Sequence, residues 1–174
     1  MYGKQKEKAM HIVLVEPEIP QNAGNIVRTC AATGTKLILV KPLGFILSDK
    51  YFKRAGLDYF DLANIEIAES FEEVYEKNKN KPFYFASTKS AKTYADVAYE
   101  EDCFLVFGKE SYGLKESLLK QHYDHCVRIP MREGTRSLNL ANSVAVILYE
   151  ALRQQNFKGL ENKGALTGRK EDET

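Results

Sequence analysis

The chain has 174 residues, of which 44% are hydrophobic, so it is long and apolar enough for one domain with a substantial core. Its 25 lysines and arginines are nearly balanced by 24 aspartates and glutamates, and the net charge of +1 gives no overall basic field, so any RNA binding must come from a local patch. Three cysteines within apolar runs favour reduced thiols and a cytoplasmic location, residues 1–10 are too polar for a signal peptide, and no apolar run approaches the roughly 18 residues of a membrane span.

Short apolar runs rich in Val, Ile, Leu and Phe predict strands that are buried on both faces. In chain order these strands are residues 11–15, 36–41, 64–68, 83–87, 103–107 and 126–129. Helical patterns between them cover residues 22–34 (capped by Asn22 and ended by Gly34), 49–55, 71–78, 114–120 and 137–154. The alternation predicts a single α/β domain with a parallel sheet over residues 11–155, preceded by a polar extension at 1–10 and followed by a flexible tail at 156–174.

The densest polar stretch is residues 129–139, Ile-Pro-Met-Arg-Glu-Gly-Thr-Arg-Ser-Leu-Asn. It lies between a strand that Pro130 ends and the last helix, which the pattern predicts to begin at Ser137. The first backbone amides of a helix have no intrahelical partners, so such a junction suits a polar ligand. Two arginines, a serine and an asparagine in this loop therefore predict a binding site.

Two further polar turns follow predicted strands. Residues 16–28, Glu-Pro-Glu-Ile-Pro-Gln-Asn-Ala-Gly-Asn-Ile-Val-Arg, include Arg28, which could bind a phosphate. A single arginine of this kind would more often be solvated, but two prolines, two asparagines and a glycine in the same turn favour a functional site. Residues 107–114, Phe-Gly-Lys-Glu-Ser-Tyr-Gly-Leu, lack the Lys and Ser/Thr of a phosphate-binding P-loop and the central glycine of a dinucleotide fingerprint. Within them Glu110 could bind a ribose, organise the loop or be a surface carboxylate. Because ligands collect where parallel strands end, the three turns predict one pocket.

Other patterns are weaker. His122, His125 and Cys126 could suggest a metal, but without a second ligand cluster we expect none. Ser137 lacks a Gly-x-Ser-x-Gly elbow and a partner histidine after it, which disfavours an acyl-enzyme. The last helix is apolar over a wide arc, so we expect it to pack against the sheet and against a second subunit in a two-fold homodimer.

Several segments together resemble the SPOUT class of RNA ribose 2′-O-methyltransferases, and within it the small tRNA (cytidine/uridine-2′-O-)methyltransferases of the YibK/TrmL type. The matching segments are residues 16–28, Arg54-Ala-Gly-Leu-Asp-Tyr59, residues 107–114, Ile129-Pro-Met with Arg136-Ser-Leu-Asn-Leu140, and Tyr149-Glu-Ala-Leu-Arg-Gln154. They cover roughly residues 11–154 in the order and spacing of that family, so the resemblance is specific.

The resemblance implies a deep C-terminal trefoil knot, which is an exception to the usual unknotted chain. It also implies that S-adenosylmethionine (AdoMet) binds in the knot, and that the enzyme is a homodimer with active sites near the subunit interface. By analogy, the cofactor-binding residues are Ala86, Gly108, Ile129, Met131, Ser137 and Leu138. No metal is needed.

The implied reaction is attack of a ribose 2′-oxygen on the methyl carbon of AdoMet, in a tRNA anticodon loop at the wobble cytidine or uridine. Arg28 matches an arginine proposed to activate the hydroxyl; because a guanidinium stays protonated, we expect it to hold the substrate phosphate and stabilise the developing alkoxide. The other implied catalytic residues are Asn22, Glu110, Ser137 and Asn139, and Tyr149 would support the RNA or the interface. Phosphate contacts are expected from Lys50, Lys53, Arg54, Arg132 and Arg136, whereas Lys4, Lys6 and Lys8 could bind RNA or simply keep the terminus solvated.

Two alternatives remain open from the sequence. One is an enzyme of the same fold that methylates ribosomal RNA or another tRNA position, and the other is a non-catalytic RNA-binding protein. Retention of all five implied catalytic residues argues against the second alternative.

Overall fold

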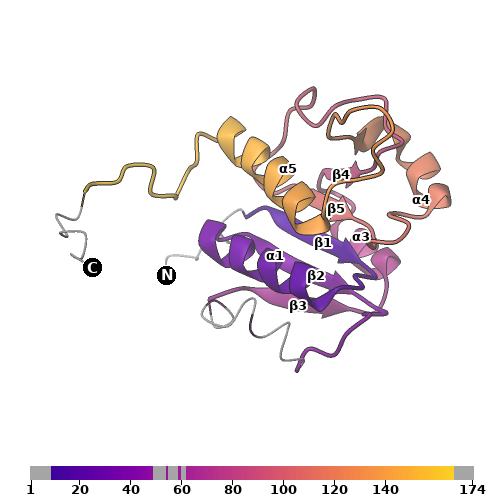
Figure 1. Ribbon diagram of the computed structural model, residues 1–174, viewed down its shortest axis with the longest axis horizontal. Helices are drawn as coiled ribbons and strands as arrows, with labels where there is room; N and C mark the ends of the chain where they lie inside the picture. Colours follow the sequence, from indigo (N-terminus) through magenta and orange to yellow (C-terminus); the bar gives the residue numbers. More distant parts are fainter. Residues whose placement is uncertain (1–8, 49–53, 55–58, 60–61, 167–174) are drawn as a thin grey trace.

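The computed structural model describes residues 9–48, 54, 59 and 62–166. They form a six-stranded sheet in the order β3-β2-β1-β5-β4-β6, and every strand pairing is parallel (Figure 1). The strands are β1 (His11–Val15), β2 (Lys36–Val40), β3 (Ile65–Ala68), β4 (Phe83–Ala86), β5 (Phe104–Phe107) and β6 (Cys126–Val127). The parallel α/β sheet predicted from the alternating pattern is confirmed, with strand ends that differ from the prediction by at most two residues.

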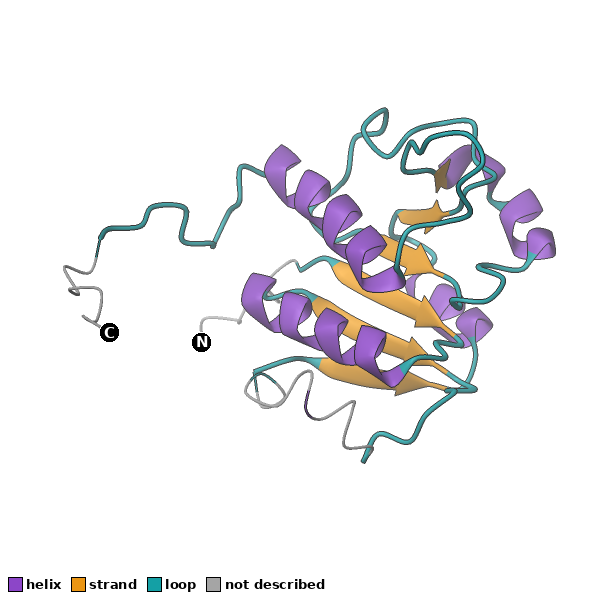
Figure 2. Ribbon diagram, viewed as in Figure 1, coloured by secondary structure: helices purple, strands orange, loops and turns teal. Residues whose placement is uncertain are grey.

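The helices cover both faces of this sheet. They are α1 (Pro20–Thr33), α3 (Phe71–Asn78), α4 (Glu116–Gln121) and α5 (Leu140–Gln154), with a short 3-10 helix at Tyr123–His125. Figure 2 shows α1 and α5 side by side across one face, with α3 behind the sheet. The helix predicted at residues 49–55 lies almost entirely outside the described residues. Within the described part of the chain, none of the helices has the length and apolar character that crossing a membrane requires.

Alternate residues of each strand face two separate cores, which explains why the strands read as continuous apolar runs. Ile12 and Leu14 of β1 belong to the cluster formed with α1 and α5. Val13 belongs to the cluster on the opposite face, where α3 and α4 pack. Beyond α5, Phe157 and Leu160 also pack against the first cluster.

Three predicted helix starts differ from the structure. Helix α4 begins at Glu116 and not at Leu114. Helix α1 begins at Pro20 after Ile19, and Asn22 lies inside its first turn and does not cap it, because proline with its fixed φ suits the first helical position. Helix α5 begins at Leu140 and not at Ser137. The side chain of Asn139 accepts hydrogen bonds from the amides of the next turn, which fixes the start of α5 three residues later than predicted.

Candidate active site

A cavity of about 580 Å³ opens where β4, β5 and β6 end and α1 and α5 begin. We call it the sheet-edge cavity. In the sheet order, the chain passes from β1 to β2 and β3 on one side, while β5, β4 and β6 lie on the other. The loops after β1 and β5 therefore diverge at this edge, which is where ligands bind in open parallel sheets. The volume is within the range of roughly 300–1,000 Å³ found for small-molecule sites.

Most residues that the sequence singled out meet in this cavity. Its lining includes Asn22, Ala86, Gly108, Glu110, Ile129, Met131, Arg136, Ser137, Leu138 and Asn139. Arg28 is not among them: it is exposed on α1, and its guanidinium lies over the ring of Tyr59 at 4.9 Å from the ring centre. The exposed Arg54 and Arg132 do not line the cavity either, and Lys50 and Lys53 lie outside the described residues.

Sequence reasoning missed one wall of the cavity. Ser87, Thr88 and Lys89, which follow β4, also line it. The signal was present in the sequence, because a run of polar residues directly follows a buried strand at the same edge of the sheet. Tyr112, which lies in the turn at residues 107–114, also lines the cavity.

A chain of side-chain hydrogen bonds joins three turns of the cavity. The Asn22 Nδ2 group donates to Glu110 Oε1 at 3.0 Å, and Asn139 Nδ2 donates to Asn22 Oδ1 at 2.9 Å. Asn139 Oδ1 in turn accepts from the amide of Ala141 at 2.9 Å, at the start of α5. Asn22 is buried, so its amide needs these partners. The three side chains thus fix α1, the loop after β5 and the start of α5 relative to one another.

Glu110 binds the backbone immediately before α1, whose N-cap residue has no capping side chain. Ile19 has no side chain that could accept a hydrogen bond from the first turn. Instead, the Glu110 carboxylate accepts from the amide of Glu18 at 2.8 Å and from that of Ile19 at 3.2 Å. A negative charge at a helix N-terminus is favourable for the helix dipole. Of the three roles that the sequence left open for Glu110, these contacts support organisation of the loop.

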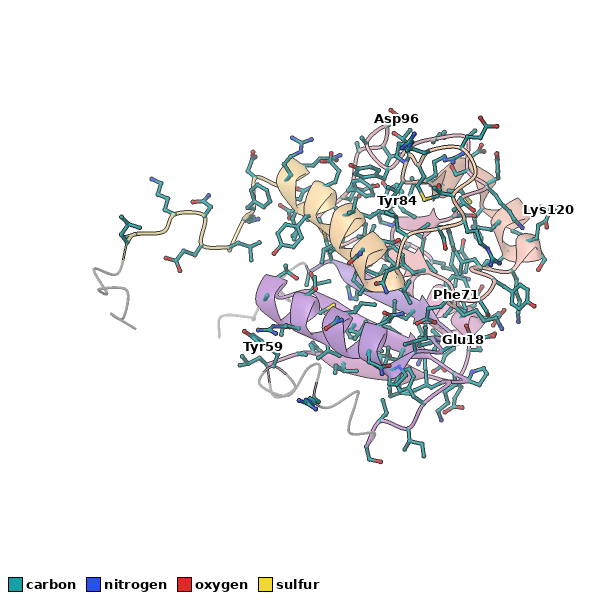
Figure 3. The ribbon with its side chains drawn as sticks, viewed as in Figure 1. Glu18, Tyr59, Phe71, Tyr84, Asp96 and Lys120 are labelled. Atoms are coloured by element: carbon teal, nitrogen blue, oxygen red, sulfur yellow. The ribbon has the colours of Figure 1, made fainter. Side chains whose placement is uncertain are left out.

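Side chains of the loop after β1 also bind the loop after β5. The Glu18 carboxylate accepts from the amide of Ser111 at 2.9 Å and from its Oγ at 2.8 Å. Glu18 lies at the edge of the sheet where the strand arrows end (Figure 3). Glu16 forms ion pairs with Lys109 at 3.1 Å and with Lys115 at 3.4 Å, and its hydrogen bond with Lys109 lowers the pKa of its carboxyl group. Glu16 and Glu18 in the loop after β1 and Glu110 in the loop after β5 therefore bind these two loops to each other.

Close backbone packing shapes the loop after β5. A Cβ at Gly108 would collide with the backbone of Gly113 and Leu114, so only glycine fits. Gly113 has a left-handed φ of 70° and donates its amide to the carbonyl of Lys109 at 2.8 Å. The turn from 109 to 113 is therefore closed on itself.

The described cysteines and histidines do not form a reactive centre in the sheet-edge cavity. Burial raises the pKa of Cys30 and of Cys103 to about 12, which keeps both thiols protonated. His122 stacks on Phe85 with ring centres 4.7 Å apart, and Cys126 is buried with its Sγ directed at the carbonyl of Leu119. Over the described ranges, no group of three or more His, Cys, Asp or Glu side chains could hold a metal ion.

A parallel α/β sheet with a polar cavity at its carboxyl edge is typical of α/β proteins that bind a ligand there, and comparison with known proteins narrows this class. The model of the SpoU rRNA methylase family matches residues 9–149, so the chain belongs to that family. It is 49% identical over 149 residues to the tRNA (cytidine(34)-2′-O)-methyltransferase of Methylovorus glucosotrophus, which covers 85% of this chain and 97% of that relative. The resemblance drawn from the sequence motifs is confirmed.

Solved structures agree in fold. One, with the description "Structural insights into the 2-OH methylation of C/U34 on tRNA", superposes with a TM-score of 0.82 at 41% identity and covers 86% of this chain and 97% of that chain. Another is the SpoU methyltransferase AviRb from Streptomyces viridochromogenes in complex with the cofactor AdoMet, with a TM-score of 0.75 at 25% identity, covering 87% of this chain and 62% of that chain.

Proposed function

We propose that this protein transfers a methyl group from AdoMet to the ribose 2′-oxygen of the wobble cytidine or uridine of a tRNA. The observation that carries the proposal is the sheet-edge cavity, in which residues from four separate turns meet in a chain that belongs to the SpoU family. The relative from Methylovorus glucosotrophus and the structure concerned with C/U34 both name this position of tRNA. A tRNA substrate also favours a cytoplasmic location.

The cavity suits AdoMet in size and chemistry. Ile129, Met131 and Leu138 offer an apolar surface for a base, while Ser87, Thr88 and the backbone after the strands offer polar groups. We assign cofactor binding to Ala86, Gly108, Ile129, Met131, Ser137 and Leu138, which all line the cavity. Bound there, AdoMet supplies a methyl group on a positively charged sulfur, so the reaction needs no metal ion.

The protein must then align the ribose and accommodate the proton of its hydroxyl group. We assign to Arg28 the task of holding the substrate phosphate and stabilising the developing negative charge on the 2′-oxygen, because its guanidinium stays protonated and can donate in a fixed geometry. The proton then passes to phosphate or water. Asn22, Glu110 and Asn139 would hold the turns in place, and Ser137 would face the ribose.

The position of Arg28 supports a homodimer. Arg28 lies six residues beyond Asn22 on α1, a distance of about 9 Å along the helix, and it does not line the cavity of its own chain. A second copy near the cavity would bring another Arg28 within reach. Val146 and Tyr149 are also exposed on the outer face of α5, which suits a subunit contact. The C-terminal trefoil knot of the SPOUT class belongs to the same proposal.

The test is transfer of labelled methyl from AdoMet to total tRNA and to ribosomal RNA, followed by mapping of the modified nucleoside. We expect label at position 34 of tRNA. Label confined to ribosomal RNA would favour the alternative substrate, and AdoMet binding without label in either RNA would favour a non-catalytic RNA-binding protein.

Arg28→Ala separates the role of this residue from cofactor binding. It should lower the rate of methyl transfer by roughly 10²- to 10⁴-fold while the affinity for AdoMet stays the same. Lys79→Ala, which removes an exposed cation beyond α3 on the opposite face, is the control and should leave both unchanged. An equal loss of AdoMet affinity in Arg28→Ala would contradict the assignment.

A further inference from the structure

The most exposed tyrosine of the described chain stands at the rim of the sheet-edge cavity. Tyr112 is 86% exposed, whereas Tyr84 and Tyr99 are buried with their hydroxyl groups bonded to backbone carbonyls. Tyr112 nevertheless belongs to the lining of the cavity, between Ser111 and Gly113. An aromatic ring held in water beside a binding cavity offers a large apolar face to a ligand.

The backbone on both sides of Tyr112 is fixed. Glu18 binds both the amide and the hydroxyl group of Ser111, at 2.9 and 2.8 Å. On the other side, Gly113 bonds back to Lys109, and its backbone packs against Gly108 so closely that no Cβ fits there. The ring is therefore held by a rigid turn, so little conformational entropy of the protein is lost when a ligand binds to it.

The charges around the ring also suit RNA. Arg136, which is exposed, lines the same cavity, whereas Lys89 in the wall after β4 is paired with Glu116 at 3.3 Å. The lysines of the loop itself, Lys109 and Lys115, are paired with Glu16. Selective contact with RNA at this rim is therefore expected from the aromatic face of Tyr112 and from Arg136. Bases of single-stranded loops are commonly recognised by stacking on exposed aromatic rings.

We propose that Tyr112 stacks on a base of the RNA substrate, at the methylated nucleotide or its immediate neighbour, and so positions the ribose for methyl transfer. The inference rests on the proposed function, because a ribose that enters the cavity brings the adjacent base to its rim. Stacking on an aromatic side chain contributes roughly 5- to 150-fold to affinity per base.

Kinetic constants for tRNA, together with AdoMet affinity, test the proposal. Tyr112→Ala should raise the KM for tRNA about ten-fold and leave the affinity for AdoMet unchanged. Tyr112→Phe should keep the wild-type KM, since stacking uses the ring face and not the hydroxyl group. Tyr123→Ala, which removes a half-exposed tyrosine outside the cavity lining, is the control and should behave like wild type.

Three results would overturn the proposal. The first is an unchanged KM in Tyr112→Ala, and the second is an equal rise in Tyr112→Phe, which would indicate a hydrogen bond of the hydroxyl group. The third is a matching loss of AdoMet affinity, which would place the ring in the cofactor site. If no methyl transfer to tRNA is found, the affinities of the same variants for an anticodon stem–loop oligonucleotide can be compared without turnover. This second measurement distinguishes failure of stacking from failure of the proposed function.

Discussion

Replacement of Glu110 by alanine should destabilise the folded protein. Its carboxylate accepts hydrogen bonds from two backbone amides at 2.8 and 3.2 Å and from Asn22 Nδ2 at 3.0 Å. Alanine removes all three bonds and leaves the buried amide of Asn22 without that acceptor. It also removes the negative charge at the start of α1, which has no side-chain cap of its own.

The size of the effect follows from these contacts. The two partly buried bonds contribute roughly 1 kcal/mol each, and the charge at the helix terminus roughly 0.5 kcal/mol, whereas the exposed bond to Ile19 adds little. The free energy of unfolding should therefore fall by about 2–3 kcal/mol. In a chain of 174 residues this corresponds to a decrease of roughly 4–12 °C in Tm. Glu110→Gln keeps one acceptor oxygen and should lose only about 1 kcal/mol.

Thermal and urea unfolding of the two variants measure these differences. Glu116→Ala is the matched control, because Glu116 is an exposed carboxylate whose ion pairs lie at the surface, and its loss should leave Tm unchanged. If Glu110→Ala unfolds at the same temperature as wild type, the carboxylate does not hold the two loops, and the reasoning from its three hydrogen bonds is refuted.

Two further predictions concern the loop after β5 and the sheet. Gly108→Ala should abolish AdoMet binding measured by calorimetry, because the added Cβ collides with the backbone of Gly113. Gly164→Ala, where a Cβ meets open space, is the control and should bind AdoMet normally. Retained AdoMet affinity in Gly108→Ala would contradict the tight turn. Burial and the nearby Lys36 lower the pKa of His11 to about 4. Between pH 6.5 and 4 the unfolded chain therefore binds a proton that the folded chain does not. The free energy of unfolding should consequently fall as pH decreases through this window. His11→Phe, which can keep the stack on Phe104, should remove that part of the dependence in urea unfolding at pH 7 and pH 4.5; identical pH profiles would show that His11 is not buried in its neutral form.

The elements with strong local patterns were predictable from the sequence. The strand at His11–Val15 and the helix at Phe71–Asn78 have the predicted bounds, because an apolar run and an amphipathic pattern mark them locally. The start of α1 was not predictable, since the carboxylate that binds the backbone before it belongs to Glu110, which is distant in sequence. The cavity itself was predicted from the three turns. That Arg28 does not line it was not predictable, because this depends on the direction of α1 and on the contact of Arg28 with Tyr59.

The distance along the chain between the amide of Glu18 and the carboxylate of Glu110 has a consequence for the order of folding. The two residues are 92 positions apart, so α1 is synthesised long before the carboxylate that binds the backbone at its start. Until β5 docks beside β1, the amides of Glu18 and Ile19 lack their acceptor on Glu110, and the entropy of closing a long loop opposes that docking. Completion of α1 and assembly of the sheet-edge cavity are therefore one cooperative event, and a nascent chain that lacks β5 has no cavity to offer a ligand.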